Sequence, residues 1–158
     1  MLPPVTDDSP DAKCGSQLSG NRRYFARSTA AVEAQLDPEV SAPTRVVTYL
    51  AAVGEAKKRN SYAFYADMVT YRPTADIYRL NSQAATRRVQ ELIEDGVREL
   101  ASRAVDASLA ALTVAHLMDG VRSGEVLEAT GLSAGEAFTE LGELLTHGLS
   151  PCPGSDDA

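Results

Sequence analysis

Apolar residues recur at helical spacing along most of the chain. Between residues 43 and 59, Val46, Leu50 and Val53 fall three or four positions apart. The segment that begins at Pro73 carries a longer apolar stripe, with arginine and glutamate on the opposite face: Ile77, Leu80, Ala84, Val89, Leu92, Ile93 and Val97. No run alternates apolar and polar residues between turn signals, as a strand would. The pattern predicts an all-α fold, an antiparallel helical bundle of about six helices.

Turn and capping residues set the expected helix boundaries. The expected helices span residues 28–36, 43–59, 62–71, 102–122 and 133–148, with a long helix from Pro73 that Gly96 either ends or merely weakens, and residues 125–132 form a connector or a short extra helix. Ser133 and Glu136 have the spacing of a capping box. Residues 1–20 contain three prolines and few apolar residues, and we expect them to be a disordered or loosely held remnant, with the tail 150–158 also disordered. The helix at 102–122 is apolar or small almost all round, which predicts burial on several sides.

The charge balance limits the possible partners. The 158 residues fit one domain, and their net charge of −7 repels phosphate backbones, which disfavours a DNA-binding module. A small molecule or a protein partner is compatible with this charge. No segment is apolar for the ~20 residues that span a bilayer, and the N-terminus lacks the features of a signal peptide. We therefore expect a cytoplasmic protein that has no membrane partner and keeps Cys14 and Cys152 as reduced thiols.

The sequence contains no motif typical of an enzyme. A glycine-rich phosphate loop, a Gly-x-Ser-x-Gly motif and a zinc signature are all missing from it. His116 has no second histidine or cysteine three or four residues away, so metal binding is not expected. We expect a protein that is not an enzyme and uses no cofactor.

Two segments resemble the C-terminal domain of TetR-family transcriptional regulators. Residues 87–97, RRVQELIEDGV, are similar to that family's long helix that ends in glycine. Residues 107–121, which close in Met118-Asp119-Gly120-Val121, are similar to its alanine-rich penultimate helix. With the final amphipathic helix, the resemblance covers residues 44–149. It implies that residues 43–149 form a ligand-binding and dimerisation domain.

A shorter segment resembles the end of that family's DNA-binding head. Residues 21–28, NRRYFARS, are similar to the place where a recognition helix leads into an aromatic turn. Arg22, Ala26 and Ser28 depart from the family pattern, and only about twenty residues precede the segment, too few for a helix-turn-helix. We interpret residues 21–42 as a remnant of the head and a linker. Arg22, Arg23 and Tyr24 are then either a remnant of a DNA contact or, for the arginines, simply solvated charges. Loss of the head, trimming and a late start all remain open, and this chain alone should bind no specific DNA.

Most of the aromatic residues cluster between positions 49 and 78, where they could line a small-molecule site or simply pack in the core. The TetR resemblance favours the site, because it implies an effector pocket among these helices. The candidate ligand-binding residues are Tyr49, Tyr62, Phe64, Tyr65, Met68, Tyr78, Asn81, Thr113 and His116. His116 has a second interpretation, a hydrogen-bonded histidine of the core.

The last two long helices carry more apolar surface than a monomeric bundle needs, which suggests a homodimer. The candidate interface residues are Ala107, Ala110, Ala111, Val114, Leu117, Val121, Phe138, Leu141 and Leu145. Two other hypotheses remain open. The chain could be a headless interaction module that dimerises with an intact regulator and binds no small molecule, or an unrelated helical bundle with a structural role.

Overall fold

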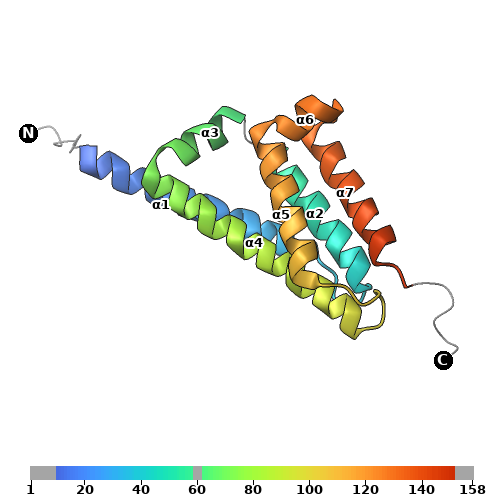
Figure 1. Cartoon of the computed structure of the whole chain (residues 1–158). Helices are drawn as coiled ribbons and strands as arrows, with labels where there is room; N and C mark the ends of the chain where they lie inside the picture. Colours follow the sequence, from blue (N-terminus) through green and yellow to red (C-terminus); the bar gives the residue numbers. More distant parts are fainter. Residues whose placement is uncertain (1–9, 59–61, 152–158) are drawn as a thin grey trace, which may run out of the picture.

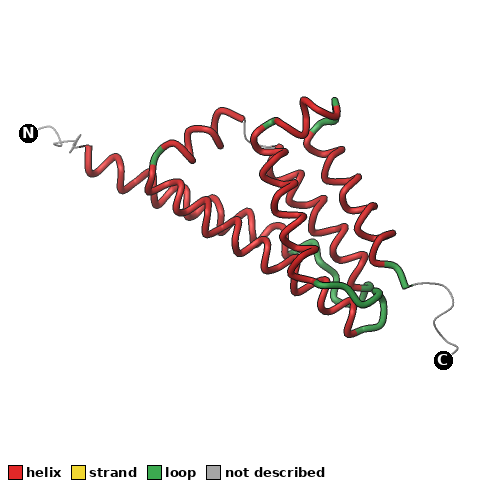
Figure 2. Tube along the Cα trace, in the orientation of Figure 1, coloured by secondary structure: helices red, strands yellow, loops and turns green. Residues whose placement is uncertain are grey.

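The computed structural model describes residues 10–58 and 62–151, and within them the chain is all helical, without a strand (Figures 1 and 2). The all-α bundle is therefore confirmed, with seven helices in the described segments. These are α1 (Pro10–Glu33), α2 (Ala42–Lys58), α3 (Tyr62–Thr70), α4 (Arg72–Arg98), α5 (Ala107–Ser123), α6 (Glu125–Thr130) and α7 (Ala134–Leu149). No helix in the described part of the chain is both long and apolar enough to cross a membrane.

The two longest helices, α1 and α4, run side by side, and α2 packs against both (Figure 1). On its other side α2 makes its most extensive contact with α7, while α5 covers α4. The main core lies where α2, α4, α5 and α7 meet, and its fully buried side chains include Leu50, Val89, Leu92, Ile93 and Val114. This arrangement leaves the N-terminal half of α1 projecting beyond most of the other helices (Figure 1).

The expectation of disorder in residues 1–20 is wrong for residues 10–20, which belong to α1. Residues 15–20 have no buried side chain, which fits their low apolar content, but a helix satisfies its own backbone hydrogen bonds, and Phe25 and Val32 anchor α1 further along. The aromatic turn expected at Tyr24 and Phe25 is also wrong, because α1 continues through both residues. The expected boundary between residues 20 and 21 therefore falls inside a continuous helix.

A buried glycine near the end of α4 positions the following loop. A Cβ atom on Gly96 would lie 2.6 Å from the Ser102 hydroxyl oxygen. Any larger residue at position 96 would therefore prevent the loop that contains Ser102 from packing this closely against α4. The amides of Ala101 and Ser102 both donate to the Gly96 carbonyl at 3.0 Å. Of the two alternatives for Gly96, the structure shows that it does not end the helix, because α4 continues to Arg98. The next helix begins at Ala107 rather than Ser102, with the Asp106 carboxylate capping the Leu109 amide at 2.8 Å.

Glycines and a capping box determine the C-terminal region. Gly124 and Gly131 adopt positive φ angles of 83° and 73° on either side of α6, a conformation that glycine tolerates without strain. The capping box is confirmed: the Glu136 amide donates to the Ser133 hydroxyl at 3.3 Å, and the Ser133 amide donates to the Glu136 carboxylate at 2.8 Å. Helix α7 ends at Leu149, one residue beyond the predicted end.

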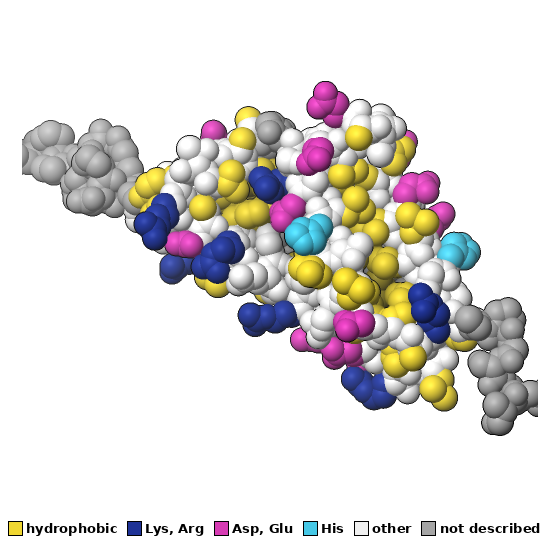
Figure 3. Space-filling model, in the orientation of Figure 1, with side chains coloured by type: hydrophobic (Ala, Val, Ile, Leu, Met, Phe, Trp, Pro, Cys, Tyr) yellow, Lys and Arg dark blue, Asp and Glu magenta, His cyan; other side chains and the backbone are white. Residues whose placement is uncertain are grey.

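Burial of α5 on several sides is not observed. Ala111, Val114 and Val121 face the core, while Leu109 is 64 % exposed and Leu112 is 50 % exposed. The space-filling view shows hydrophobic side chains gathered over α5 and α7 on the face that it presents (Figure 3). Helix α5 is therefore a surface helix with an outer apolar stripe.

Candidate functional site

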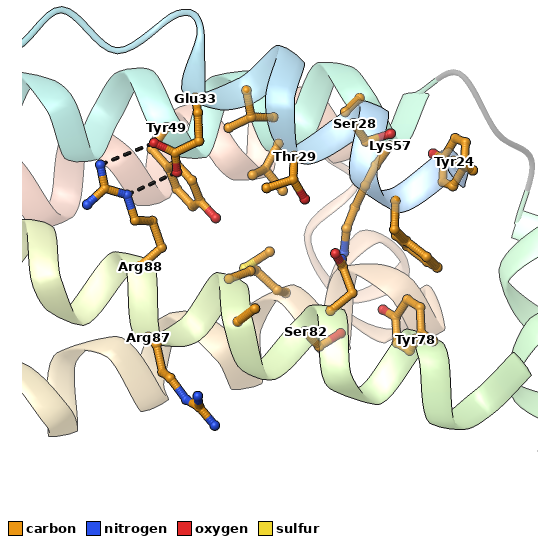
Figure 4. Close-up of a pocket in the computed structure, with 18 of the residues that line it drawn as sticks. Tyr24, Ser28, Thr29, Glu33, Tyr49, Lys57, Tyr78, Ser82, Arg87 and Arg88 are labelled. Atoms are coloured by element: carbon orange, nitrogen blue, oxygen red, sulfur yellow. Dashed lines mark hydrogen bonds and ion pairs between the residues drawn. The ribbon is translucent and has the colours of Figure 1, made fainter. Parts of the chain in front are cut away.

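A cavity of about 380 Å³ lies between α1, α2 and α4, with Tyr65 of α3 and Met118 of α5 completing its wall (Figure 4). Its lining is apolar and aromatic over most of its surface, but nine of its twenty residues are polar and five of those are charged. Exposed residues of α1 and α4, including Thr29, Ala84 and Arg87, border its mouth. This volume lies in the range of small-molecule pockets, roughly 300–1,000 Å³.

Five aromatic rings from three helices build one end of this cavity. Tyr24 and Phe25 of α1, Phe64 and Tyr65 of α3, and Tyr78 of α4 contact each other edge to face, with centroids 5.3–6.2 Å apart. The hydroxyl oxygens of Tyr24 and Tyr65 are 3.4 Å apart. Such edge-to-face pairs add to area burial, so they hold the short α3 against α1 and α4.

An ion pair joins α1 to α4 beside the other end of the cavity. The Arg88 guanidinium donates to both oxygens of Glu33, at 3.0 and 3.2 Å, and to Glu91 at 3.2 Å (Figure 4). Tyr49 lies next to this pair and is buried. Burial, reinforced by the charge of Glu33, raises the pKa of the Tyr49 phenol to about 12, so the phenol stays a neutral hydrogen-bonding group at physiological pH.

Lys57, near the end of α2, carries its amine into the interior of the protein. Figure 4 shows this amine pointing between α1 and α4. The Nζ atom also lies 5.8 Å from the centroid of the Phe138 ring, which offers a weak cation–π attraction. Burial lowers the pKa of Lys57 to about 8, because desolvation penalises the charged form.

A second hollow, of about 720 Å³, lies between α4 and α5 and shares part of its wall with the first. The shared residues are Lys57, Tyr78, Ser82, Arg87 and Met118. The Arg122 guanidinium lies 5.6 Å from the centroid of the Tyr78 ring and 3.5 Å from the Asp119 carboxylate. Lys57 therefore stands at the boundary between an aromatic cavity and a polar hollow.

The structure brings together four of the nine predicted ligand-binding residues in the first cavity: Tyr49, Tyr65, Tyr78 and Asn81. Phe64 and Met68 pack behind the aromatic wall and do not line it. Thr113 is exposed on α5 and its hydroxyl donates to the Leu109 carbonyl, so its assignment to the site is wrong. The side chain of Tyr62 lies outside the described residues.

His116 borders the second hollow and is exposed. Its interpretation as a core histidine is wrong, because α5 turns this side of the helix toward solvent. It lines the hollow on which Lys57, Arg87 and Arg122 also lie, and it is absent from the wall of the aromatic cavity.

Several residues of the cavity were missed from sequence. Ser28, Thr29, Val32 and Glu33 of α1 line it, as do Lys57 and Arg88. The α1 residues were missed because α1 was assigned to a remnant of another domain. Lys57 lies near the expected end of the helix at residues 43–59, where a cation is ordinary, and the only signal of its burial is that α2 carries core residues on the same side one turn earlier.

The predicted dimer residues are largely used inside the chain. Five of them are buried within the single chain, so their assignment to a dimer interface is corrected: their contacts are intramolecular. These are Ala111, Val114, Val121, Phe138 and Leu141. Ala107, Ala110, Leu117 and Leu145 are partly buried against the same core. The exposed apolar residues of these two helices are instead Leu109, Leu112 and Leu144.

The residues assigned to a DNA-binding remnant lie within α1. Arg22 and Arg23 are exposed. Tyr24 packs instead against Phe25 and Phe64 and contributes to the cavity, so it has a structural place in the aromatic wall.

Within the described segments, no three histidine, cysteine, aspartate or glutamate side chains are grouped to hold a metal ion. Comparison with known proteins finds no family model, no curated protein and no solved structure that matches the chain.

Proposed function

We propose that this chain is the effector-sensing and dimerisation domain of a TetR-like transcriptional regulator, and that it binds a small, partly apolar molecule between α1, α2 and α4. The observation that supports ligand binding is the cavity of about 380 Å³ lined by Tyr49, Tyr65 and Tyr78. The regulator class rests on the sequence resemblance of residues 44–149.

The lining of the cavity indicates what kind of molecule it would hold. Apolar side chains such as Val32, Val53 and Met118 offer contacts for a hydrocarbon or aromatic body. The amide of Asn81 makes no hydrogen bond with another described residue, so it is available to orient a polar group. A ligand with one apolar body and one or two polar groups satisfies both features.

The position of α1 suggests how binding would be transmitted. One half of α1 lines the cavity, and its N-terminal half extends beyond the other helices (Figure 1). A ligand that prefers a different spacing between α1 and α4 would therefore displace the projecting end. The displacement can only be as large as the difference in ligand affinity between the two arrangements.

A homodimer is the second part of the proposal. Leu109 and Leu112 on α5 and Leu144 on α7 are at least half exposed, and they provide an outer apolar face that a second copy would cover. Light scattering after size exclusion should give twice the chain mass, and the double variant Leu109→Glu/Leu144→Glu should give the mass of one chain. A monomer in the unmodified protein would rule out this part.

Ligand binding is tested with a thermal-shift library of apolar and amphipathic compounds, followed by calorimetry. A ligand at about 100 times its Kd would add ~2.7 kcal/mol to stability. Ala85→Leu should abolish binding, because residue 85 lines the cavity and the larger side chain would fill it. Ala51→Leu, on an exposed position of α2, is the matched control and should bind normally.

A wide library that gives no response would contradict the ligand-binding proposal. In that case, ready formation of mixed dimers with an intact regulator would favour the interaction-module hypothesis. In either case we expect no specific duplex binding by this acidic chain, and a sequence-dependent, salt-resistant gel shift would contradict that expectation.

A further inference from the structure

Lys57 is a largely buried cation that no carboxylate neutralises directly. Its amine makes no hydrogen bond or ion pair with any residue that the structure describes. The carboxylate with the largest influence on it is Asp119, which is exposed and already bonded to Arg122 at 3.5 Å. An internal charge without a partner is unfavourable, and a bound anion would relieve that cost.

The charges around Lys57 reinforce its effect. The hollow on its α5 side is lined by Lys57, Arg79, Arg87 and Arg122, and by one carboxylate, Asp119. Arg79 is paired with Asp76 and Arg122 with Asp119, while Arg87, like Lys57, has no ion pair among the described residues. This region is thus locally positive in a chain whose net charge is −7.

The surroundings of the Lys57 amine differ on its two sides. Toward α1 lies the aromatic cavity, and toward α5 lies the positive hollow. A neutral ligand would leave the amine without a partner. A molecule with an apolar body and an anionic end would satisfy the cavity and the cation together.

We propose that the ligand of this cavity is an amphipathic monocarboxylate, with its carboxylate on the Lys57 amine and its hydrocarbon or aromatic body against Val32, Val53 and Tyr65. This inference rests on the ligand-binding function proposed above and names its ligand class. The lowered pKa of about 8 still leaves Lys57 mostly protonated near neutral pH, as such a contact requires. Arg87, at the mouth, adds long-range attraction.

The test uses a matched ligand set: decanoate, decanamide and decanol, with phenylbutyrate and its amide as an aromatic pair. Calorimetry at a pH of about 7 compares the unmodified chain with Lys57→Met, which keeps the length of the side chain without its charge. Lys57→Arg restores the charge. Arg98→Met, on the exposed end of α4 away from both hollows, controls for the overall loss of one positive charge.

The unmodified chain and Arg98→Met should bind a carboxylate at least about tenfold more tightly than its amide or alcohol. Lys57→Met should lose that preference while it still binds the neutral analogues, and Lys57→Arg should recover part of it. Equal affinity for carboxylate and amide, or a preference that survives in Lys57→Met, would overturn this inference and leave the proposed function intact. Failure of all five compounds to bind the unmodified chain would also overturn this inference, whereas the proposed function is overturned only if the wide library gives no response.

Discussion

The carboxylate of Glu33 on α1 accepts two hydrogen bonds from the guanidinium of Arg88 on α4, and this pair stands beside the cavity. Both side chains remain about one third exposed. The pair therefore contributes little to global stability, but it ties together the two helices whose separation would open the cavity.

Glu33→Gln should reduce the free energy of unfolding by no more than about 1 kcal/mol, because solvent screens the pair. It should accelerate amide hydrogen exchange in residues 28–33 and weaken ligand binding. Asp76→Asn, which breaks the exposed pair with Arg79 on α4, is the control and should leave exchange in α1 unchanged. If Glu33→Gln and Arg88→Gln have strictly additive effects on exchange, the two side chains do not act together.

Gly54 of α2 lies where this helix packs closely against α7, so a larger residue there should destabilise the protein. A Cβ atom at this position would lie 3.1–3.3 Å from three atoms of Phe138, whose side chain is 2 % exposed and cannot move aside easily. Gly54→Ala should destabilise the protein by about 1–3 kcal/mol, although alanine is the better helix former. Chemical denaturation would measure the change.

Gly20 supplies the matched control within α1. A Cβ atom there meets no other atom within 4 Å, so Gly20→Ala should stabilise the protein by up to about 1 kcal/mol through helix propensity alone. Opposite signs for the two alanine variants are expected. A stabilised Gly54→Ala variant would mean that α2 and α7 are less closely packed than described.

The helical pattern could be predicted because each helix of the bundle buries one face. Periodic apolar residues located α2 and most of α4, and the Ser133 capping box located the start of α7. Helix α1 was predicted only in part, because none of the side chains of residues 15–24 is buried and so no apolar stripe marks this part of the helix. Leu80 was assigned to the core stripe of α4, yet it is 58 % exposed, since no helix covers that part of α4.

The site was harder to predict than the fold. Tyrosines near positions 49, 65 and 78 indicated a pocket because their residue type combines an apolar ring with a polar group. The contribution of α1 depends on its packing beside α4, a long-range contact that periodicity does not reveal. In the same way, spacing showed that α5 and α7 are amphipathic, but not that their buried faces are occupied by α2 and α4 of the same chain.

Leu100 adopts a left-handed conformation, with φ of 57°, although it is neither glycine nor asparagine. This conformation costs a residue that has a Cβ atom roughly 1–2 kcal/mol, and the Leu100 side chain is 85 % exposed, so it gains little from packing. Leu100→Gly should therefore stabilise the protein, by about 1 kcal/mol. Thermal unfolding measures the gain, and Leu100→Ala, which removes most of the side chain but keeps the strain, should show no comparable increase.

Lys57 should make stability depend on pH in the alkaline range. Its pKa is lowered from 10.5 to about 8 in the folded chain, so between these values the unfolded chain binds more protons at this residue. Stability should then rise with pH across this window. Tyr49 acts in the opposite direction above a pH of 10.0, since its pKa is raised from that value to about 12, so the contribution of Lys57 is best measured below it.

Lys57→Met should remove this rise and, below a pH of about 8, should increase the free energy of unfolding by at most about 3 kcal/mol, because a desolvated charge is eliminated. The charged groups around Lys57 are Asp119 and Arg122 of α5, together with the charged residues that line the two hollows: Glu33 of α1 and Arg79, Arg87, Arg88 and Glu91 of α4. Aspartate, glutamate and arginine do not change charge in this range of pH, so the difference between the two proteins reports on Lys57. Urea denaturation of both at several pH values measures it, and parallel curves would show that the amine is hydrated rather than buried.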